Sequence, residues 1–377
     1  MKKLLLAFLM LVPGLIFAQK KSMTPKTFDL IVGAYTSGKS KGIAVYRFYA
    51  ETGKLAYLSQ IDDVSNPSYL TASANNKFVY AVNENDQGEV SAFNFEPKTG
   101  QLKFINKVST LGGAPCYVSV DKNQKNLFIA NYSGGNIAVV PIKADGSVDL
   151  ATQTIKDPGH GPNKDRQEKA HVHTAVLSPD EKYVLYTDLG TDKINITKYK
   201  GSKTSPIVPA NPAFVSITPG YGPRHLAFSA NKKYLYLITE MGSSVILFDY
   251  NNGKLKQKQD ITLLPDGFTG STGAADIHLS PDGKFLYASN RGDANDISVF
   301  SVNPEDGILT FIERKSSGGK GPRNFAIDPT GNWLLVANQN SDSIIVLRID
   351  PATGKLTQSF NRIEVGNPVC LKFTPAE

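Results

Sequence analysis

Three arginines occupy matching places in a repeated pattern of strand-like segments. Arg224 and Arg323 each begin an apolar segment, and Arg291 follows the end of another. Guanidinium groups gathered in one pocket repel one another unless an anion is bound, and they hold carboxylate or phosphate groups through paired hydrogen bonds. The arginines therefore predict a site for a small anionic molecule. In the alternative, each arginine pairs with an acid and joins neighbouring units of the fold; the available acids are Asp188, Glu240 and Asp276.

Two histidines are candidates for proton transfer. His171 and His173 stand at the start of another apolar segment. Because side chains alternate along a strand, we expect the two imidazoles to point to opposite sides, and the position at the strand start favours His173 as the one that faces the site. Glu240, in the next repeat, can orient and charge-balance an imidazole that acts as a general base. The alternative is a purely structural histidine.

An insertion supplies a further candidate. Residues 157–168, within the longest interval between repeats, are rich in Gly and Pro and include Arg166. They predict either an ordinary surface loop or a lid in which Arg166 adds an anion contact. The predicted substrate-binding residues are Arg323, Gln339, His171, Arg166 and His225.

The repeat itself predicts the fold. An apolar strand, a polar turn and a second strand recur about every 50 residues, and each copy continues with two further alternating strands. This period fits one four-stranded antiparallel blade of a β-propeller. The second strands of the six explicit copies begin at Phe78, Asn126, Tyr183, Tyr234, Phe285 and Trp333.

The two ends of the chain complete one more blade. Residues 28–55 provide a second, third and fourth strand without a first, and residues 367–375 match a first strand. Pairing them removes two open sheet edges. The prediction is an all-β, seven-bladed propeller closed by N- and C-terminal strands that share a blade; a β-sandwich array is the alternative, which the even period disfavours. In such a ring the candidate residues border one mouth of the central channel.

Composition and the N-terminus limit the classes of function and the location that the protein can have. The 377 residues carry a formal charge of +7, but the lysines are spread over turns, which is typical of a solvated rim and does not indicate nucleic-acid binding. A basic start, an apolar run over residues 4–17 and Ala18 predict a signal peptide at 1–18, followed by a single propeller domain at 19–377. The run is short for a membrane span, so we expect a periplasmic or secreted protein that is not held in the membrane. Cys116 and Cys370 are predicted to be two separately buried thiols.

Several stretches resemble the seven-bladed propeller lactonases, a family that includes bacterial 6-phosphogluconolactonases of the propeller type and the fungal carboxy-muconate lactonizing enzyme. The resemblance covers nearly all of the chain after residue 18 and is carried by residues 32–48, 166–190, 220–240, 274–292 and 321–347. It implies that the active-site residues are His173, Arg224, Glu240 and Arg291, and it places Arg323 and Gln339 at recurrent family positions.

The implied activity is hydrolysis of an anionic sugar lactone, as part of carbohydrate metabolism. His173, oriented by Glu240, would deprotonate a water, while Arg224 and Arg291 stabilise the oxyanion and hold the anionic group. Arginines rather than carboxylates dominate the mouth, so no metal or other cofactor is expected, and the substrate is the only expected partner of a monomer. The alternatives are a carboxy-muconate-type lactonizing enzyme and a non-catalytic ligand-binding propeller, which would not need His173 beside Glu240.

Overall fold

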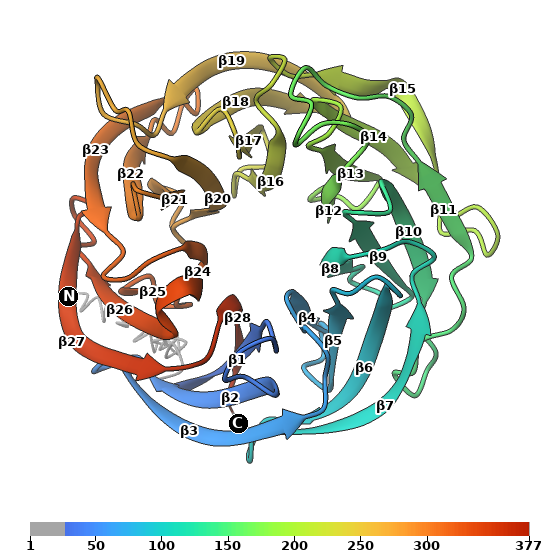
Figure 1. Ribbon diagram of the computed structural model, residues 1–377, viewed down its shortest axis with the longest axis horizontal. Helices are drawn as coiled ribbons and strands as arrows, with labels where there is room; N and C mark the ends of the chain where they lie inside the picture. The colour runs from blue at the N-terminus through green and yellow to red at the C-terminus, as the bar shows by residue number, and fades with distance from the viewer. Residues whose placement is uncertain (1–26, 377) are drawn as a thin grey trace, which may run out of the picture.

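Seven four-stranded sheets form a ring around a central axis (Figure 1). The computed structural model describes residues 27–376, and every strand pairing within the sheets is antiparallel, as in β1 with β2. The predicted seven-bladed propeller is therefore confirmed. The predicted signal peptide lies outside the described residues. Within residues 27–376, no helix has the length and apolar character needed to cross a membrane.

Each sheet runs from an inner strand near the axis to an outer strand at the rim (Figure 1). In this order, the first three sheets are β28 (Pro368–Pro375), β1 (Thr27–Ala34), β2 (Gly42–Tyr49), β3 (Lys54–Asp62); β4 (Leu70–Ala72), β5 (Phe78–Asn83), β6 (Glu89–Glu96), β7 (Gln101–Ser109); and β8 (Pro115–Val120), β9 (Asn126–Asn131), β10 (Asn136–Pro141), β11 (Gln153–Lys156).

The remaining four sheets follow the same order around the ring. They are β12 (Val172–Leu177), β13 (Tyr183–Asp188), β14 (Lys193–Tyr199), β15 (Ile207–Ser216); β16 (Pro223–Phe228), β17 (Tyr234–Thr239), β18 (Ser244–Asn251), β19 (Lys254–Thr262); β20 (Thr272–Leu279), β21 (Phe285–Gly292), β22 (Asp296–Val302), β23 (Leu309–Ser316); and β24 (Pro322–Ile327), β25 (Trp333–Asn338), β26 (Ser343–Ile349), β27 (Leu356–Glu364), with a 3₁₀ turn, η1 (Gln339–Ser341), after β25.

The closing blade joins the two ends of the chain as predicted. The inner strand β28 pairs with β1 in a register that sets Leu30 opposite Phe373. The second strands β9, β17 and β25 are buried along their whole length, whereas the outer strand β7 is largely exposed. Strands covered on both faces read as continuous apolar runs, which explains the sequence pattern. The hydrophobic core lies between neighbouring sheets, where Leu334 and Val336 cluster with Tyr287.

The inner strands share an irregularity near their start. Proline is the first residue of β8, β16, β24 and β28, a position at which no ladder N–H is required. A β-bulge follows directly in β8, β12, β16 and β24, so one residue in each is left without a partner in the second strand. Bulges re-aim side chains next to active sites. The inserted residues are Cys116, His173, Arg224 and Arg323.

Candidate active site

Two sets of side chains meet where the inner strands begin, an end of the ring that we call the arginine face. Because Pro223 at the start of β16 pairs with Thr239 at the end of β17, inner-strand starts and second-strand ends lie together. The first set is the bulge residues. The second set lies at or directly after the ends of the second strands and comprises Tyr35, Glu84, Tyr132, Glu240, Arg291 and Gln339.

One buried carboxylate gathers three of the arginines. Glu240 Oε2 accepts a hydrogen bond from Arg224 Nε at 2.9 Å and lies 3.2 Å from Arg291 Nη2. Its Oε1 accepts from Arg166 Nη2 at 2.6 Å. These arginines come from the same blade, the next blade and the insertion. The structure thus brings together Arg224, Glu240 and Arg291, and it adds Arg166.

The charge of this cluster is fixed by its geometry. Burial alone would raise the pKa of Glu240, but Arg291 and then Arg224 hold it well below its usual value, so the group is ionised. Arg224 is 1% exposed, and burial followed by the charge of Arg323 lowers its pKa. Burial lowers the pKa of Arg291 to about 10. Both guanidinium groups remain protonated at neutral pH.

Arg323 has different surroundings. Its guanidinium carbon lies 5.6 Å from the centre of the Tyr35 ring, and the Tyr35 hydroxyl donates to Glu84 at 2.9 Å. No ion pair within residues 27–376 links Arg323 to an acid. Around Glu240, three guanidinium groups face one carboxylate, so this cluster keeps an excess of positive charge. Of the three acids in the alternative, Glu240 alone forms ion pairs with these arginines, because Asp188 accepts from backbone amides such as that of His171 and Asp276 pairs with two histidines.

His173 is buried beside this cluster and carries no charge at neutral pH. Its ring centre lies 5.2 Å from that of His225 and 5.6 Å from that of Tyr132. Burial, then Arg224 and His225, lower the pKa of His173 well below its usual value. Its Nδ1 is buried without a hydrogen-bond partner among the described residues. Glu240 therefore acts on His173 through its charge, and its oxygens are occupied by arginines.

The expectation that His171 and His173 point to opposite sides is wrong. The ring of His171 stacks on Tyr132 at 4.5 Å, and His173 contacts the edge of the same ring. Residues two apart in an extended chain share a side. The His171 imidazole contacts the Tyr132 carbonyl oxygen at 3.1 Å through Nδ1 and the Glu168 carboxylate at 3.1 Å through Nε2. These contacts tie His171 to the insertion.

The insertion is anchored against the ring at several points. Gln167 is fully buried, and its Nε2 donates to the Leu189 carbonyl at 2.8 Å. A Cβ at Gly190 would lie 1.8 Å from the Lys169 carbonyl oxygen, so the backbone of the insertion can approach only a glycine there. The Arg166 side chain reaches Glu240 from this anchored segment. The segment covers one side of the carboxylate.

His225 lies one layer below Arg224 along β16. Arginine can only donate, so the 3.3 Å contact between Arg224 Nη1 and His225 Nε2 makes Nε2 the acceptor and leaves the proton on Nδ1. That proton is donated to Asp276 Oδ1 at 2.7 Å. Burial, then Arg224, lower the pKa of His225 to about 4, so the ring is neutral. The prediction that His225 binds substrate stays a prediction; in the structure its ring contacts Arg224 on one side and Asp276 on the other.

Gln339 and the two cysteines make fewer contacts in the site. Gln339 is half-buried at the start of η1, and its backbone N–H donates to Gly321. Cys116 and Cys370 are both free and buried, as predicted. Burial raises the pKa of Cys116, which keeps this neighbour of His173 a protonated thiol. Sequence reasoning missed Tyr35, whose place after β1 matches that of Glu84 after β5 and could have revealed it.

Comparison with known proteins identifies the class. The family model described as "Lactonase, 7-bladed beta-propeller" matches residues 29–373. The chain belongs to this family of enzymes.

Individual relatives cover almost the whole chain. The 6-phosphogluconolactonase of Bacillus subtilis is 36% identical over 91% of this chain and 97% of its own length. That of Formosa agariphila is 37% identical over 87% and 94%. The solved structure of a periplasmic gluconolactonase from Pseudomonas aeruginosa superposes with a TM-score of 0.89 at 40% identity, covering 93% of this chain and all of that one.

Proposed function

We propose that the protein hydrolyses an anionic sugar lactone at the arginine face. The observation that carries this proposal is a neutral, buried His173 with an unpartnered Nδ1 beside a group of arginines whose charge exceeds that of the nearby acids. A neutral imidazole can accept a proton, and excess guanidinium charge stabilises an oxyanion. Membership of the lactonase family supports the same reaction.

In the proposed mechanism, His173 takes a proton from a water as the water oxygen attacks the lactone carbonyl. The carbonyl π electrons move to oxygen, and Arg224 and Arg291 stabilise the resulting oxyanion. When the carbonyl re-forms, the ring C–O bond breaks, and the imidazolium returns its proton to the leaving oxygen. The low pKa of the resting His173 favours this return. The product is an open-chain hydroxy acid.

The other residues bind and position. Glu240 holds Arg224 and Arg291 side by side, which a pair of like charges would otherwise resist. Arg323, free of an ion pair among the described residues, and Gln339 are proposed to hold the anionic group of the substrate. Arg166 closes the opposite side of the cluster from the insertion.

The substrate class and compartment are part of the proposal. Relatives named 6-phosphogluconolactonase and periplasmic gluconolactonase support a sugar lactone, with or without a phosphate. The predicted signal peptide and the periplasmic relative support a location in the periplasm or outside the cell. A muconolactone remains the contrasting substrate for the test.

The test is hydrolysis followed in a pH-stat by the chain without residues 1–18. Gluconolactone, 6-phosphogluconolactone and a muconolactone are compared, with and without EDTA. We expect turnover of a sugar lactone that EDTA leaves unchanged. Turnover of the muconolactone alone would replace the proposed substrate. Rates no higher than spontaneous hydrolysis on all three would favour a ligand-binding propeller.

His173→Gln tests the proposed base. Loss of general-base catalysis should lower kcat by roughly 10²–10⁴-fold, while the affinity for the product anion changes little, because the arginines remain. The matched control is His160→Gln, in the exposed part of the insertion, which should keep wild-type kinetics. Equal losses of kcat and of anion affinity in His173→Gln would contradict the assigned role.

A further inference from the structure

Side chains at one level of the inner strands form a layer near the central axis of the propeller. This layer consists of Tyr69, which directly precedes β4, and of Tyr117, His225, Asp276 and Asn324 in β8, β16, β20 and β24. Tyr69 and Tyr117 stack at 4.1 Å, and both contact the edge of the His225 ring. His225 donates to Asp276, which also accepts from Asn324. The arginine face lies on one side of this layer.

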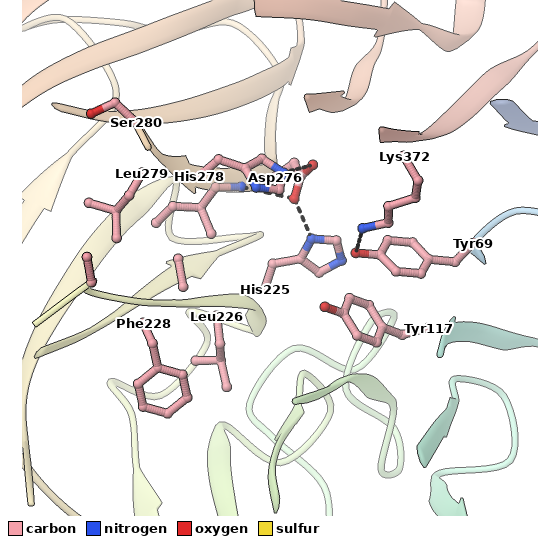
Figure 2. Close-up of a pocket in the computed structure, with 13 residues that line it drawn as sticks. Tyr69, Tyr117, His225, Leu226, Phe228, Asp276, His278, Leu279, Ser280 and Lys372 are labelled. Carbon is pink, nitrogen blue, oxygen red and sulfur yellow. Dashed lines mark hydrogen bonds and ion pairs between the residues drawn. The ribbon is translucent and has the colours of Figure 1, made fainter. Parts of the chain in front are cut away.

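On the other side lies a cavity of about 370 Å³, which we call the lower chamber. Figure 2 shows its polar lining, with Tyr69, Tyr117 and His225 at one wall, Lys372 above Tyr69, and Asp276 beside His278. Apolar side chains such as Phe228 and Leu279 complete it. A concave space with a few convergent polar groups on apolar walls is typical of a small-molecule site.

The lower chamber contains a cation without a partner acid. Lys372 is half-buried; its Nζ lies 4.5 Å from the centre of the Tyr69 ring and donates to the Tyr69 hydroxyl at 3.0 Å. No carboxylate of residues 27–376 forms an ion pair with it. At the same depth the other inner strands carry small or neutral side chains, except for His278 in β20.

Asp276, the one acid among the residues that line the lower chamber, accepts hydrogen bonds at both carboxylate oxygens. Asp276 Oδ1 accepts from His225 Nδ1 at 2.7 Å and from the Ile277 amide at 3.0 Å. Its Oδ2 accepts from His278 Nε2 at 2.9 Å, from Asn324 and from the Phe325 amide at 3.3 Å. With these hydrogen bonds made, Asp276 pairs with His225 and His278 and forms no ion pair with Lys372.

We propose that the lower chamber is a second binding site, separate from the catalytic face, for a small organic oxyanion held by Lys372 and the Tyr69–Tyr117 pair. The ligand bears a carboxylate or a phosphate, since a half-buried ammonium with adjacent hydroxyl donors complements either group. The apolar walls accommodate the body of the ligand. This proposal does not depend on lactone hydrolysis.

The experiment uses histidine-selective NMR, because the chain contains only five histidines. The full chain without residues 1–18 is titrated in separate arms with inorganic phosphate and with propionate, and the His278 signal is identified by its loss in His278→Asn. We expect a saturable shift of the His278 signal in at least one arm, which also distinguishes phosphate from carboxylate. No saturable shift in either arm would overturn the proposal.

Three variants locate the bound anion. Lys372→Gln should weaken binding about tenfold, as expected for one charge-assisted hydrogen bond, and Lys372→Arg should retain it, which separates charge from folding. Lys182→Gln, with the same loss of charge in an exposed turn, and Arg323→Ala, on the arginine face, should leave the His278 titration unchanged. A shift unaffected by Lys372→Gln, or abolished by Arg323→Ala, would contradict a separate lower site.

Discussion

The two faces of the ring are built from one repeat but satisfy their polar groups differently. On the face opposite the arginines, the Ser178 hydroxyl donates to Asp180 at 2.7 Å and accepts from the Tyr183 amide at 3.1 Å, all within one turn. The same closure recurs in residues 73–78, 229–234 and 280–285. On the arginine face, Glu240 binds the next blade and the insertion. Blades are also joined away from the arginine face, where the Tyr236 hydroxyl donates to the Gly307 carbonyl. What distinguishes the site is therefore the gathering of charged groups from two blades and the insertion on one carboxylate.

Glu240→Gln should produce the largest change in stability. The substitution leaves Arg224, which is 1% exposed, without its acid. Removing one partner of a buried ion pair costs about 3–5 kcal/mol. We expect that loss in the free energy of unfolding, measured by urea denaturation.

The matched control is Glu89→Gln, which breaks an exposed ion pair with Lys107 at 2.8 Å. It should cost at most about 1 kcal/mol. If Glu240→Gln costs no more than this control, the cluster on the arginine face is no different energetically from an ordinary surface pair.

The fold was predictable because the sequence pattern that specifies each blade is local and recurs along the chain. The spacing of strands and turns required blades, and the unmatched first strand at residues 367–375 required the shared blade, which the pairing of β28 with β1 confirms. The candidate site was predictable only to the level of a face. Position in the repeat placed Arg224 and Glu240 at one end of the ring, and both are there.

The contacts within the site depend on features that the repeat does not encode. The bulge in β16 separates Arg224 from His225 into two layers, although they are adjacent in sequence. The sharing of Glu240 among three arginines depends on how neighbouring blades meet. The sides of His171 and His173 were mispredicted because alternation was applied to residues two positions apart, which share a side.

Asp276→Asn should show whether Asp276 positions Arg224 through His225. Asp276 is an acceptor for every one of its partners, so an amide NH₂ in its place faces donors and disturbs the proton on His225 Nδ1. His225 then no longer presents Nε2 to Arg224. A misplacement of about 1 Å can cost roughly 10²-fold in rate, and we expect kcat to fall by roughly 10–100-fold.

Asp121→Asn is the comparison for Asp276→Asn. Asp121 is also buried and accepts from the backbone amides of Lys125 and Asn126 in a turn opposite the arginine face. It should lower the free energy of unfolding but leave kcat unchanged. Equal kcat values for the two variants would show that Asp276 has only a structural role.

Asp157→Asn should change how stability depends on pH. Asp157, at the start of the insertion, accepts from Tyr186 and Asn195, and burial followed by the nearby Asp188 raises its pKa to about 7 from the ordinary 3.8. Between about pH 4 and pH 7 the unfolded chain releases this proton while the folded chain keeps it, so stability falls as pH rises. The variant removes this loss. The Tm of the variant minus the Tm of the wild type should therefore be more positive at pH 8 than at pH 5.

The control for Asp157→Asn is Asp165→Asn, an exposed residue of the same insertion. Its Tm should follow the wild-type profile at both pH values. If the two variants have parallel profiles, Asp157 does not hold its proton in the folded protein, and the attachment of the insertion does not depend on pH through this group.

The smallest effect should come from the face opposite the arginines. Ser178→Ala removes one hydroxyl that bonds to Asp180 and Tyr183 within its own turn and also lies against Tyr250 of the next blade, so the loss should be roughly 0.5–1.5 kcal/mol in the free energy of unfolding. Because Ser178 and Glu240 share no partner, the cost of the double variant with Glu240→Gln should equal the two single costs within about 0.5 kcal/mol. Ser178→Ala should also leave kcat within about twofold of wild type, since a change of that size corresponds to only about 0.4 kcal/mol in the barrier. A tenfold fall in kcat, or strong non-additivity, would show that the turns are coupled energetically to the arginine face. Hydrogen bonding within one turn would then not distinguish residues that maintain the fold from residues that form the site.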